Sequence, residues 1–169
     1  MNRVLVVGGG LAGVEAAWAL ANRGVPVTIA EMKPKKHSPA HKTDMLAELV
    51  CSNSLKAQRV GSAAGLLKAE MERLGSICVE CAKKCSVPAG GALAVDRDEF
   101  SRMITEKIKS HPLIELECRE VTDIPEGNVI IAAGPLASDA LAEKIKELCG
   151  GSLSFFDAAA PIVTDESID

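Results

Sequence analysis

The first part of the chain alternates apolar runs with a helical pattern. Residues 4–7 are four aliphatic residues in a row, residues 11–23 carry apolar side chains at helical spacing, and a second apolar run ends at Glu31. Short apolar runs bounded by glycine are typical of buried strands. The pattern therefore predicts a strand, a helix and a second strand over residues 3–32.

Further periodic segments follow. Their spacing predicts helices over residues 62–74 and 138–149, a third helix between Asp96 and His111, and strands over residues 113–118 and 129–133. Residues 43–50 are expected to make two helical turns. The apolar side chains expected to face inward are Met45, Leu46 and Leu49 in that short segment and Leu141, Ile145 and Leu148 in the last helix. In the helix over residues 62–74, the side chains that share one face are Leu67, Met71 and Leu74.

A glycine-rich turn, Gly8-Gly9-Gly10-Leu11-Ala12-Gly13, joins the first strand to the first helix. Gly8 permits a tight turn, Gly10 lets the backbone approach a pyrophosphate, and Gly13 lets the helix pack close to the strand. A diphosphate there would lie on free amides at the positive end of the helix dipole. Because the turn follows a predicted strand and opens a predicted helix, it indicates a dinucleotide site.

Glu31 lies at the end of the second predicted strand, eighteen residues after Gly13. A carboxylate at this place accepts a hydrogen bond from a ribose hydroxyl and repels a 2′-phosphate, so FAD or NAD is favoured over NADP. Gly134 follows the strand over residues 129–133 and offers a second point of backbone approach, with a simple buried strand as the alternative. The fold predicted is α/β, a Rossmann-like FAD-binding domain with a parallel sheet flanked by helices.

Length and composition narrow the functional classes. A chain of 169 residues suffices for one domain, residues 1–169, but is too short for a flavin domain and a complete substrate domain. We therefore expect the N-terminal part of a longer flavoprotein, with a helical and loop segment inserted at about residues 36–95. A net charge of −4 gives no global reason to expect nucleic-acid binding. The absence of a recognisable signal peptide or membrane span predicts a cytoplasmic protein without membrane contact.

Residues 32–42 form a basic loop with four lysines, two histidines and no acidic residue. A solvated loop is one interpretation, but its position after a parallel strand favours ligand contact. Cys51 follows, with Lys56 and Arg59 close in sequence. Nearby cations lower the pKa of a thiol and increase its reactivity, whereas a buried structural cysteine is the alternative.

Three more cysteines, Cys78, Cys81 and Cys85, are spaced by two and three residues. Such spacing is compatible with a zinc or iron–sulfur site, with a redox pair or with free thiols. A closed metal site normally needs a fourth ligand, and no other Cys or His is adjacent, so no metal ligand is assigned.

Three segments resemble the folate- and FAD-dependent tRNA (uracil-5-)-methyltransferase family, TrmFO, formerly called Gid. They are Glu31-Met32-Lys33-Pro34, the run from Pro39 through Cys51 to Ser54, and residues 87–97. The likeness covers nearly all of the chain, and members of the family are considerably longer. The group of three cysteines is not part of the family pattern.

The resemblance implies a flavoenzyme that methylates the T-loop uridine of tRNA, with methylenetetrahydrofolate as carbon donor and NADH or NADPH as reductant of FAD. It implies that Cys51 acts on the uracil ring, where a thiolate added at C6 makes C5 nucleophilic. A second functional cysteine of the family is expected beyond Asp169. The cofactor-binding residues are expected to be Gly8, Gly9, Gly10, Leu11, Ala12, Gly13, Glu31, Lys33 and Gly134, and candidate substrate contacts, by position only, are His41, Lys42 and Asn53.

Other functions stay open at this point. Flavoproteins that modify the tRNA wobble uridine share the glycine turn and use folate, although the segment around Cys51 argues against them. A general FAD/NAD(P)H oxidoreductase would use Cys78 and Cys81 as a redox pair. The chain alone is also compatible with a nucleotide-binding fragment that has no activity.

Overall fold

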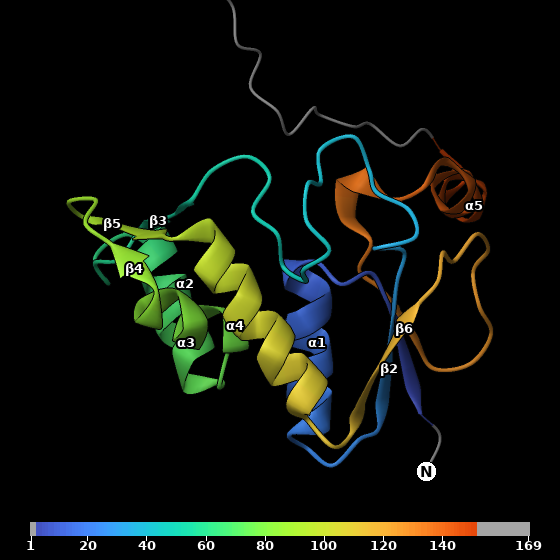
Figure 1. Cartoon of the computed structure of the whole chain (residues 1–169), viewed down its shortest axis with the longest axis horizontal. Helices are drawn as coiled ribbons and strands as arrows, with labels where there is room; N and C mark the ends of the chain where they lie inside the picture. Colours follow the sequence, from blue (N-terminus) through green and yellow to red (C-terminus); the bar gives the residue numbers. More distant parts are fainter. Residues whose placement is uncertain (1–2, 152–169) are drawn as a thin grey trace, which may run out of the picture.

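A four-stranded parallel sheet stands at the centre of the computed structural model, which describes residues 3–151 (Figure 1). All neighbouring strands in it are parallel. The carboxyl ends of parallel strands lie at one edge of the sheet, so the loops that follow them meet there. In spatial order the strands are β6 (Ile114–Cys118), β2 (Val27–Glu31), β1 (Val4–Val7) and β7 (Val129–Ile131).

Helices cover both faces of this sheet (Figure 1). Because of that cover, the central strands β1 and β2 are largely buried and mostly apolar rather than alternating, with Thr28 and Glu31 as the polar residues. Val6 and Ile29 belong to a large core on one face, whereas Val7 and Ala30 belong to a smaller core on the other. The larger core is covered by α1 (Leu11–Ala21), α3 (Ile77–Lys84) and α4 (Arg97–Ser110), and the smaller by α5 (Asp139–Cys149), which follows the short helix η1 (Gly134–Leu136).

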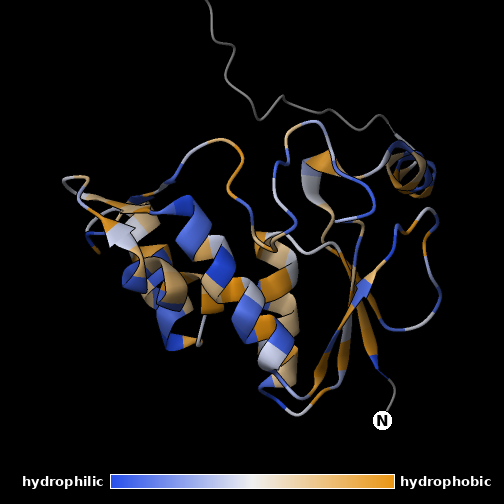
Figure 2. Cartoon of the chain, viewed as in Figure 1, coloured by the Kyte–Doolittle hydropathy of each residue, from blue (hydrophilic) through white to orange (hydrophobic). Residues whose placement is uncertain are grey.

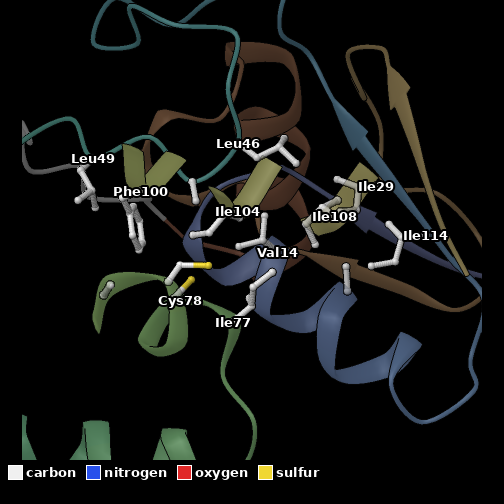
Figure 3. Packing of buried hydrophobic residues seen from close by; sticks show 14 of the residues in the cluster. Val14, Ile29, Leu46, Leu49, Ile77, Cys78, Phe100, Ile104, Ile108 and Ile114 are labelled. Atoms are coloured by element: carbon white, nitrogen blue, oxygen red, sulfur yellow. The ribbon is translucent and has the colours of Figure 1, made fainter. Parts of the chain in front are cut away.

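The amphipathic pattern of α4 explains how it packs. Phe100, Ile104 and Ile108 are fully buried, and Figure 3 shows them directed toward Val14 of α1 and Ile77 of α3. Polar and apolar bands alternate along the same helix in Figure 2. The Oδ1 atom of the N-cap residue, Asp96, accepts a hydrogen bond from the amide of Glu99, which satisfies one of the free amides of the first turn.

A second, three-stranded antiparallel sheet lies beside α2 and α3, away from the parallel sheet (Figure 1). It is formed by part of the chain between β2 and α4. Its strands and the helix against them are β3 (Ser54–Ala57), β5 (Ala92–Val95), β4 (Ser86–Val87) and α2 (Ala63–Arg73). This sheet, α2 and α3 all fall within the segment expected to be inserted at about residues 36–95, and the domain boundaries themselves stay a prediction.

The α/β fold with a helix-flanked parallel sheet is confirmed, but two local predictions were wrong. Residues 43–50 are not helical, because Ala47 has a φ of 52° and the amides of Leu46 and Ala47 donate to the Thr105 hydroxyl and the Gly9 carbonyl rather than along a helix. The apolar face predicted for residues 62–74 is largely exposed among the described residues, since Leu67 on α2 is 56% exposed and its C-cap residue, Leu74, is 73% exposed. Leu148 on α5 is 72% exposed rather than inward, because α5 is buried mainly through Leu141.

Among residues 3–151, none of the helices has the length and apolar character that a membrane span requires.

Candidate functional site

A cleft of about 310 Å³ lies over the carboxyl ends of the parallel strands. Its walls come from loops that are far apart in sequence, including the loop after β2 that arches over the sheet in Figure 1. The predicted site residues that line it are Gly8, Gly9, Gly10, Leu11, Ala12, Glu31, Lys33, His41 and Gly134. These predicted residues therefore lie together in one cleft.

Two glycines of the turn are required by close backbone packing. Gly8 has a φ of 102°, and a Cβ there would lie 2.8 Å from the carbonyl oxygen of Ala132. A Cβ on Gly13 would lie 1.9 Å from the carbonyl oxygen of Gly8. Both distances are shorter than atomic contact allows, so these glycines bring α1, β1 and the end of β7 together. Gly13 does not line the cleft and acts from behind it.

Gly10 differs from these two, because a Cβ placed on it would meet no atom within 4 Å. Its φ of −73° is accessible to any residue, so neither strain nor packing explains a glycine here. The amides of Gly10, Leu11, Ala12 and Gly13 find no acceptor among the described residues, as expected for the first turn of a helix. The open side of Gly10 is therefore a place where an anion can approach the N-terminus of α1.

Glu31 is buried beside the turn, with 8% of its surface exposed. Its Oε2 atom accepts a hydrogen bond from the amide of Gly9 at 2.7 Å, and its Oε1 atom accepts one from the amide of Lys33 at 3.0 Å. The two bonds fix the carboxylate at the wall of the cleft. Each carboxylate oxygen has a second lone pair, so the group retains acceptor capacity for a hydroxyl.

Lys33 is almost fully buried, and its ammonium donates to the carbonyl oxygen of Met45 and lies 3.4 Å from the Oε2 atom of Glu48. Glu48 in turn accepts hydrogen bonds from the amides of Lys42 and Thr43. Burial alone would raise the pKa of Glu48, but these two amides and the Lys33 charge together lower it. Lys33 and Glu48 therefore close the loop on itself as a charged, hydrogen-bonded pair.

The three candidate substrate contacts lie in different surroundings. His41 lines the cleft, and burial followed by the Lys33 charge lowers the pKa of its imidazole, which favours the neutral ring at pH 7. Lys42 is exposed outside the cleft lining. The side-chain amide of Asn53 donates to the carbonyl oxygen of Val95 at 3.2 Å, which joins it to the antiparallel sheet.

Cys51 lies on the loop between the cleft and β3, and its side chain is exposed. It does not line the cleft itself, but the preceding residue, Val50, does. Consecutive Cα atoms are about 3.8 Å apart, so the Cα atom of Cys51 lies at the rim of the cleft. A sulfur buried in an apolar core could not react with a substrate, but the Cys51 side chain is exposed.

Cys78, Cys81 and Cys85 are buried and free. Burial is the main cause that raises the pKa of each thiol, to about 11 for Cys81 and further still for Cys78, where Glu15 adds to the effect. Within residues 3–151, no cluster of three or more Cys, His, Asp or Glu side chains has a geometry suited to a metal ion. The thiols therefore behave as core side chains that resist ionisation.

Sequence reasoning missed the wall contributed by the loop after β6 and by the start of α5. Arg119, Glu120 and Val121 line the cleft there, and the amide of Arg119 donates to the carbonyl oxygen of Glu31. The hydroxyl of Ser138 also lines the cleft, is buried, and makes no hydrogen bond of normal geometry with the described residues. Alternation in β6 could have pointed to the residues just after it, but no local pattern marks Ser138.

Comparison with known proteins places these features in a family. A model of the family described as Glucose inhibited division protein A matches residues 3–169. A protein from Enterococcus faecalis named methylenetetrahydrofolate–tRNA-(uracil-5-)-methyltransferase TrmFO is 58% identical over 169 residues, which cover 99% of this chain and 39% of that protein. An Aquifex aeolicus protein of the same name is 62% identical over 170 residues, 99% of this chain and 38% of that protein.

The chain thus spans less than half the length of these curated relatives. The solved structure of Aquifex aeolicus GidA superposes with a TM-score of 0.59 and 18% identity, over 75% of this chain and 21% of that chain. At 18% identity the superposition shows a similar fold and nothing further. The family match and the high identity to proteins named TrmFO agree with the resemblance in residues 31–34, 39–54 and 87–97. The chain belongs to the family described as Glucose inhibited division protein A.

Proposed function

We propose that this chain is the FAD-binding part of an enzyme that methylates C5 of a tRNA T-loop uridine with methylenetetrahydrofolate. The observation that carries the proposal is the open side of Gly10, with unpaired amides at the N-terminus of α1, in a cleft walled by Glu31. The activity is taken from the name shared by relatives 58% and 62% identical to the chain.

The residues of the cleft fit an adenine dinucleotide. The amides of residues 10–13 suit the diphosphate, and the carboxylate of Glu31 suits ribose hydroxyls and repels a 2′-phosphate. The buried hydroxyl of Ser138, which makes no hydrogen bond of normal geometry with residues 3–151, offers a further hydrogen bond to the ligand. Gly134 lines the same wall. Lys33 is one of the proposed cofactor-binding residues because it shapes the cleft. Its ammonium is turned toward Met45 and Glu48.

Cys51 is proposed as the nucleophile. Its thiolate adds to C6 of the uracil ring, so that the electron pair moves onto the C4 carbonyl and C5 becomes nucleophilic toward the one-carbon unit of the folate. Loss of the C5 proton then expels tetrahydrofolate and leaves an exocyclic methylene group on C5, with the sulfur still on C6. Reduced FAD, when bound, would supply a hydride to that methylene, and the sulfur leaves C6 as the methyl group forms. Lys56, five residues beyond Cys51, adds a cation on β3, the strand that follows the Cys51 loop.

The remaining components of the reaction are assigned at a coarser level. NADH or NADPH is proposed as the source of reducing equivalents, tRNA as the macromolecular partner and the cytoplasm as the compartment. His41, Lys42 and Asn53 are the proposed substrate contacts, with His41 the one that lines the cleft. A thiol oxidoreductase based on Cys78 and Cys81 is disfavoured, because burial raises the pKa of both thiols.

The test uses the natural protein that carries this chain, with a T-loop transcript as substrate. Methyl transfer to C5 is expected with methylenetetrahydrofolate and a nicotinamide reductant, in a protein whose absorption spectrum shows bound flavin. S-adenosylmethionine serves as the control donor and is expected to give none. Methylation that depends on S-adenosylmethionine, or a protein that binds neither FAD nor folate, would overturn the proposal.

A further inference from the structure

The segment that leads to Cys51 bends sharply at residues 46–47. This bend, called the corner below, contacts the glycine turn. Leu46 and Ala47 are each 1% exposed, and Ala47 adopts a φ of 52°, a left-handed conformation that is uncommon for alanine. The amide of Ala47 donates to the carbonyl oxygen of Gly9 at 2.8 Å. The Leu46 side chain also packs on this glycine, since a Cβ added to Gly9 would lie 2.5 Å from its Cδ2 atom.

The same corner is held from the other side by two buried hydroxyls of α4. The Oγ1 atom of Thr105 accepts a hydrogen bond from the amide of Leu46 at 2.9 Å. Its own proton is donated to the carbonyl oxygen of Ser101 at 2.7 Å, so the hydroxyl is oriented to accept. The Ser101 hydroxyl donates to the carbonyl oxygen of Ala47 at 3.4 Å. The corner is therefore clamped between α4 and the glycine turn.

Cys51 is four residues beyond this clamp. Leu49 is 8% exposed and belongs to the larger core, and Val50 lines the cleft. Cys51 is therefore the first exposed residue after the corner. Resting on the function proposed above, we infer that Thr105 is a positioning residue. It fixes the corner at residues 46–47 and thereby sets where the Cys51 sulfur stands relative to a dinucleotide on the glycine turn.

The polar character of these side chains supports the inference. Thr105 and Ser101 lie on the buried face of a helix whose other inward residues include Phe100, Ile104 and Ile108. An apolar side chain at either place would serve packing equally well, whereas the Thr105 hydroxyl accepts from the buried amide of Leu46 and the Ser101 hydroxyl donates to the carbonyl oxygen of Ala47. A left-handed corner without that acceptor would have an unpaired amide and little to hold it against the turn.

The test compares Thr105→Val, which keeps the shape of the side chain, with Thr105→Ser, which keeps the hydroxyl. Ser110→Ala is the matched control, because Ser110 lies on α4 with an exposed hydroxyl bonded to the carbonyl oxygen of Lys107. Three quantities are measured in the natural protein: hydrogen exchange of the segment containing Leu46, the alkylation rate of Cys51 with Cys149 as internal reference, and methylation kcat per bound flavin.

Thr105→Val is expected to speed exchange at Leu46 by 10-fold or more, to change the Cys51 alkylation rate by at least 3-fold relative to Cys149, and to lower kcat by 10-fold or more. Thr105→Ser is expected to restore all three, and Ser110→Ala to change none. If Thr105→Val is too unstable to purify, Ser101→Ala is expected to give the same three changes with smaller size.

Unchanged exchange at Leu46, or faster exchange with an unchanged Cys51 rate, would overturn the inference. Exchange and alkylation need no substrate. They therefore still decide the inference if the methylation reaction itself proves to be wrongly assigned.

Discussion

A Cβ atom on Gly13 would lie 1.9 Å from the carbonyl oxygen of Gly8, so the first turn of α1 touches the end of β1 backbone to backbone. Gly10, three residues earlier in sequence, has no atom within 4 Å of the same position. The two glycines of one turn therefore serve different purposes. One permits the fold, and the other faces the cleft.

Alanine substitutions at these two glycines should separate the roles. Gly13→Ala forces backbone atoms apart and is expected to cost more than about 3 kcal/mol in the free energy of unfolding. Gly10→Ala is expected to cost within about 1 kcal/mol, the range of an altered N-cap, yet to weaken FAD binding by 10-fold or more because the methyl group occupies the diphosphate position. Urea unfolding and flavin titration measure the two effects. Gly10→Ala with unchanged flavin affinity would remove the diphosphate from this turn.

Glu31→Gln should destabilise the wall of the cleft and weaken the binding of FAD. The carboxylate accepts from the amides of Gly9 and Lys33, whereas a glutamine amide group presents a donor to one of them. An unsatisfied amide costs about 1–3 kcal/mol, and FAD affinity should fall with it. Glu106→Gln is the control, because that exposed carboxylate pairs with Arg102 on α4 and neither residue lines the cleft. Equal flavin affinity in both variants would mean that the ribose lies elsewhere.

The glycine turn and Glu31 could be predicted because each is a local pattern with a fixed spacing. The corner at Ala47 could not be, because its conformation depends on contacts with Gly9 and with Ser101 of α4, which is 54 residues away. The apolar residues in 43–50 have helical spacing because Leu46 and Leu49 are buried in the core, although the segment is not a helix. Ser138 was missed because only the folded chain shows that its hydroxyl is buried in the cleft wall, without a hydrogen bond of normal geometry to the residues that the structure describes.

Acid should weaken the closed loop after β2. The pKa of Glu48 is lower in the folded protein than its ordinary value of 4.5, because hydrogen bonds from Lys42 and Thr43 and the Lys33 charge outweigh the opposing effect of burial. A depressed carboxylate pKa gives stability that is complete above pH 4.5 and is lost as the pH falls through the folded value.

Glu48→Gln is therefore expected to be about 1–3 kcal/mol less stable than the wild type at pH 7. The difference should shrink as the pH falls below 4.5, where the wild-type carboxylate also becomes neutral. Urea unfolding at a series of pH values measures both chains. A difference that stays constant down to pH 3 would show that the charge of Glu48 contributes nothing.

Five of the six cysteines should fall into a reactive and a protected group. Cys51 and Cys149 are exposed, whereas Cys78, Cys81 and Cys85 are buried with raised pKa values. Iodoacetamide at pH 8 is expected to label the first two at least 100-fold faster than the three thiols of α3 and its C-cap, because alkylation needs an accessible thiolate. Peptide mass spectrometry reads out each site. Rapid labelling of the α3 group in the folded protein would contradict this packing.

The most direct measurement is methylation of a T-loop transcript by Cys51→Ala, alongside Cys149→Ala as an exposed-thiol control, with bound flavin quantified in each. The account predicts that Cys51→Ala retains flavin and loses methyl transfer by 1,000-fold or more, whereas Cys149→Ala keeps both. Methylation by Cys51→Ala at the rate of the wild type would contradict the assignment of the nucleophile.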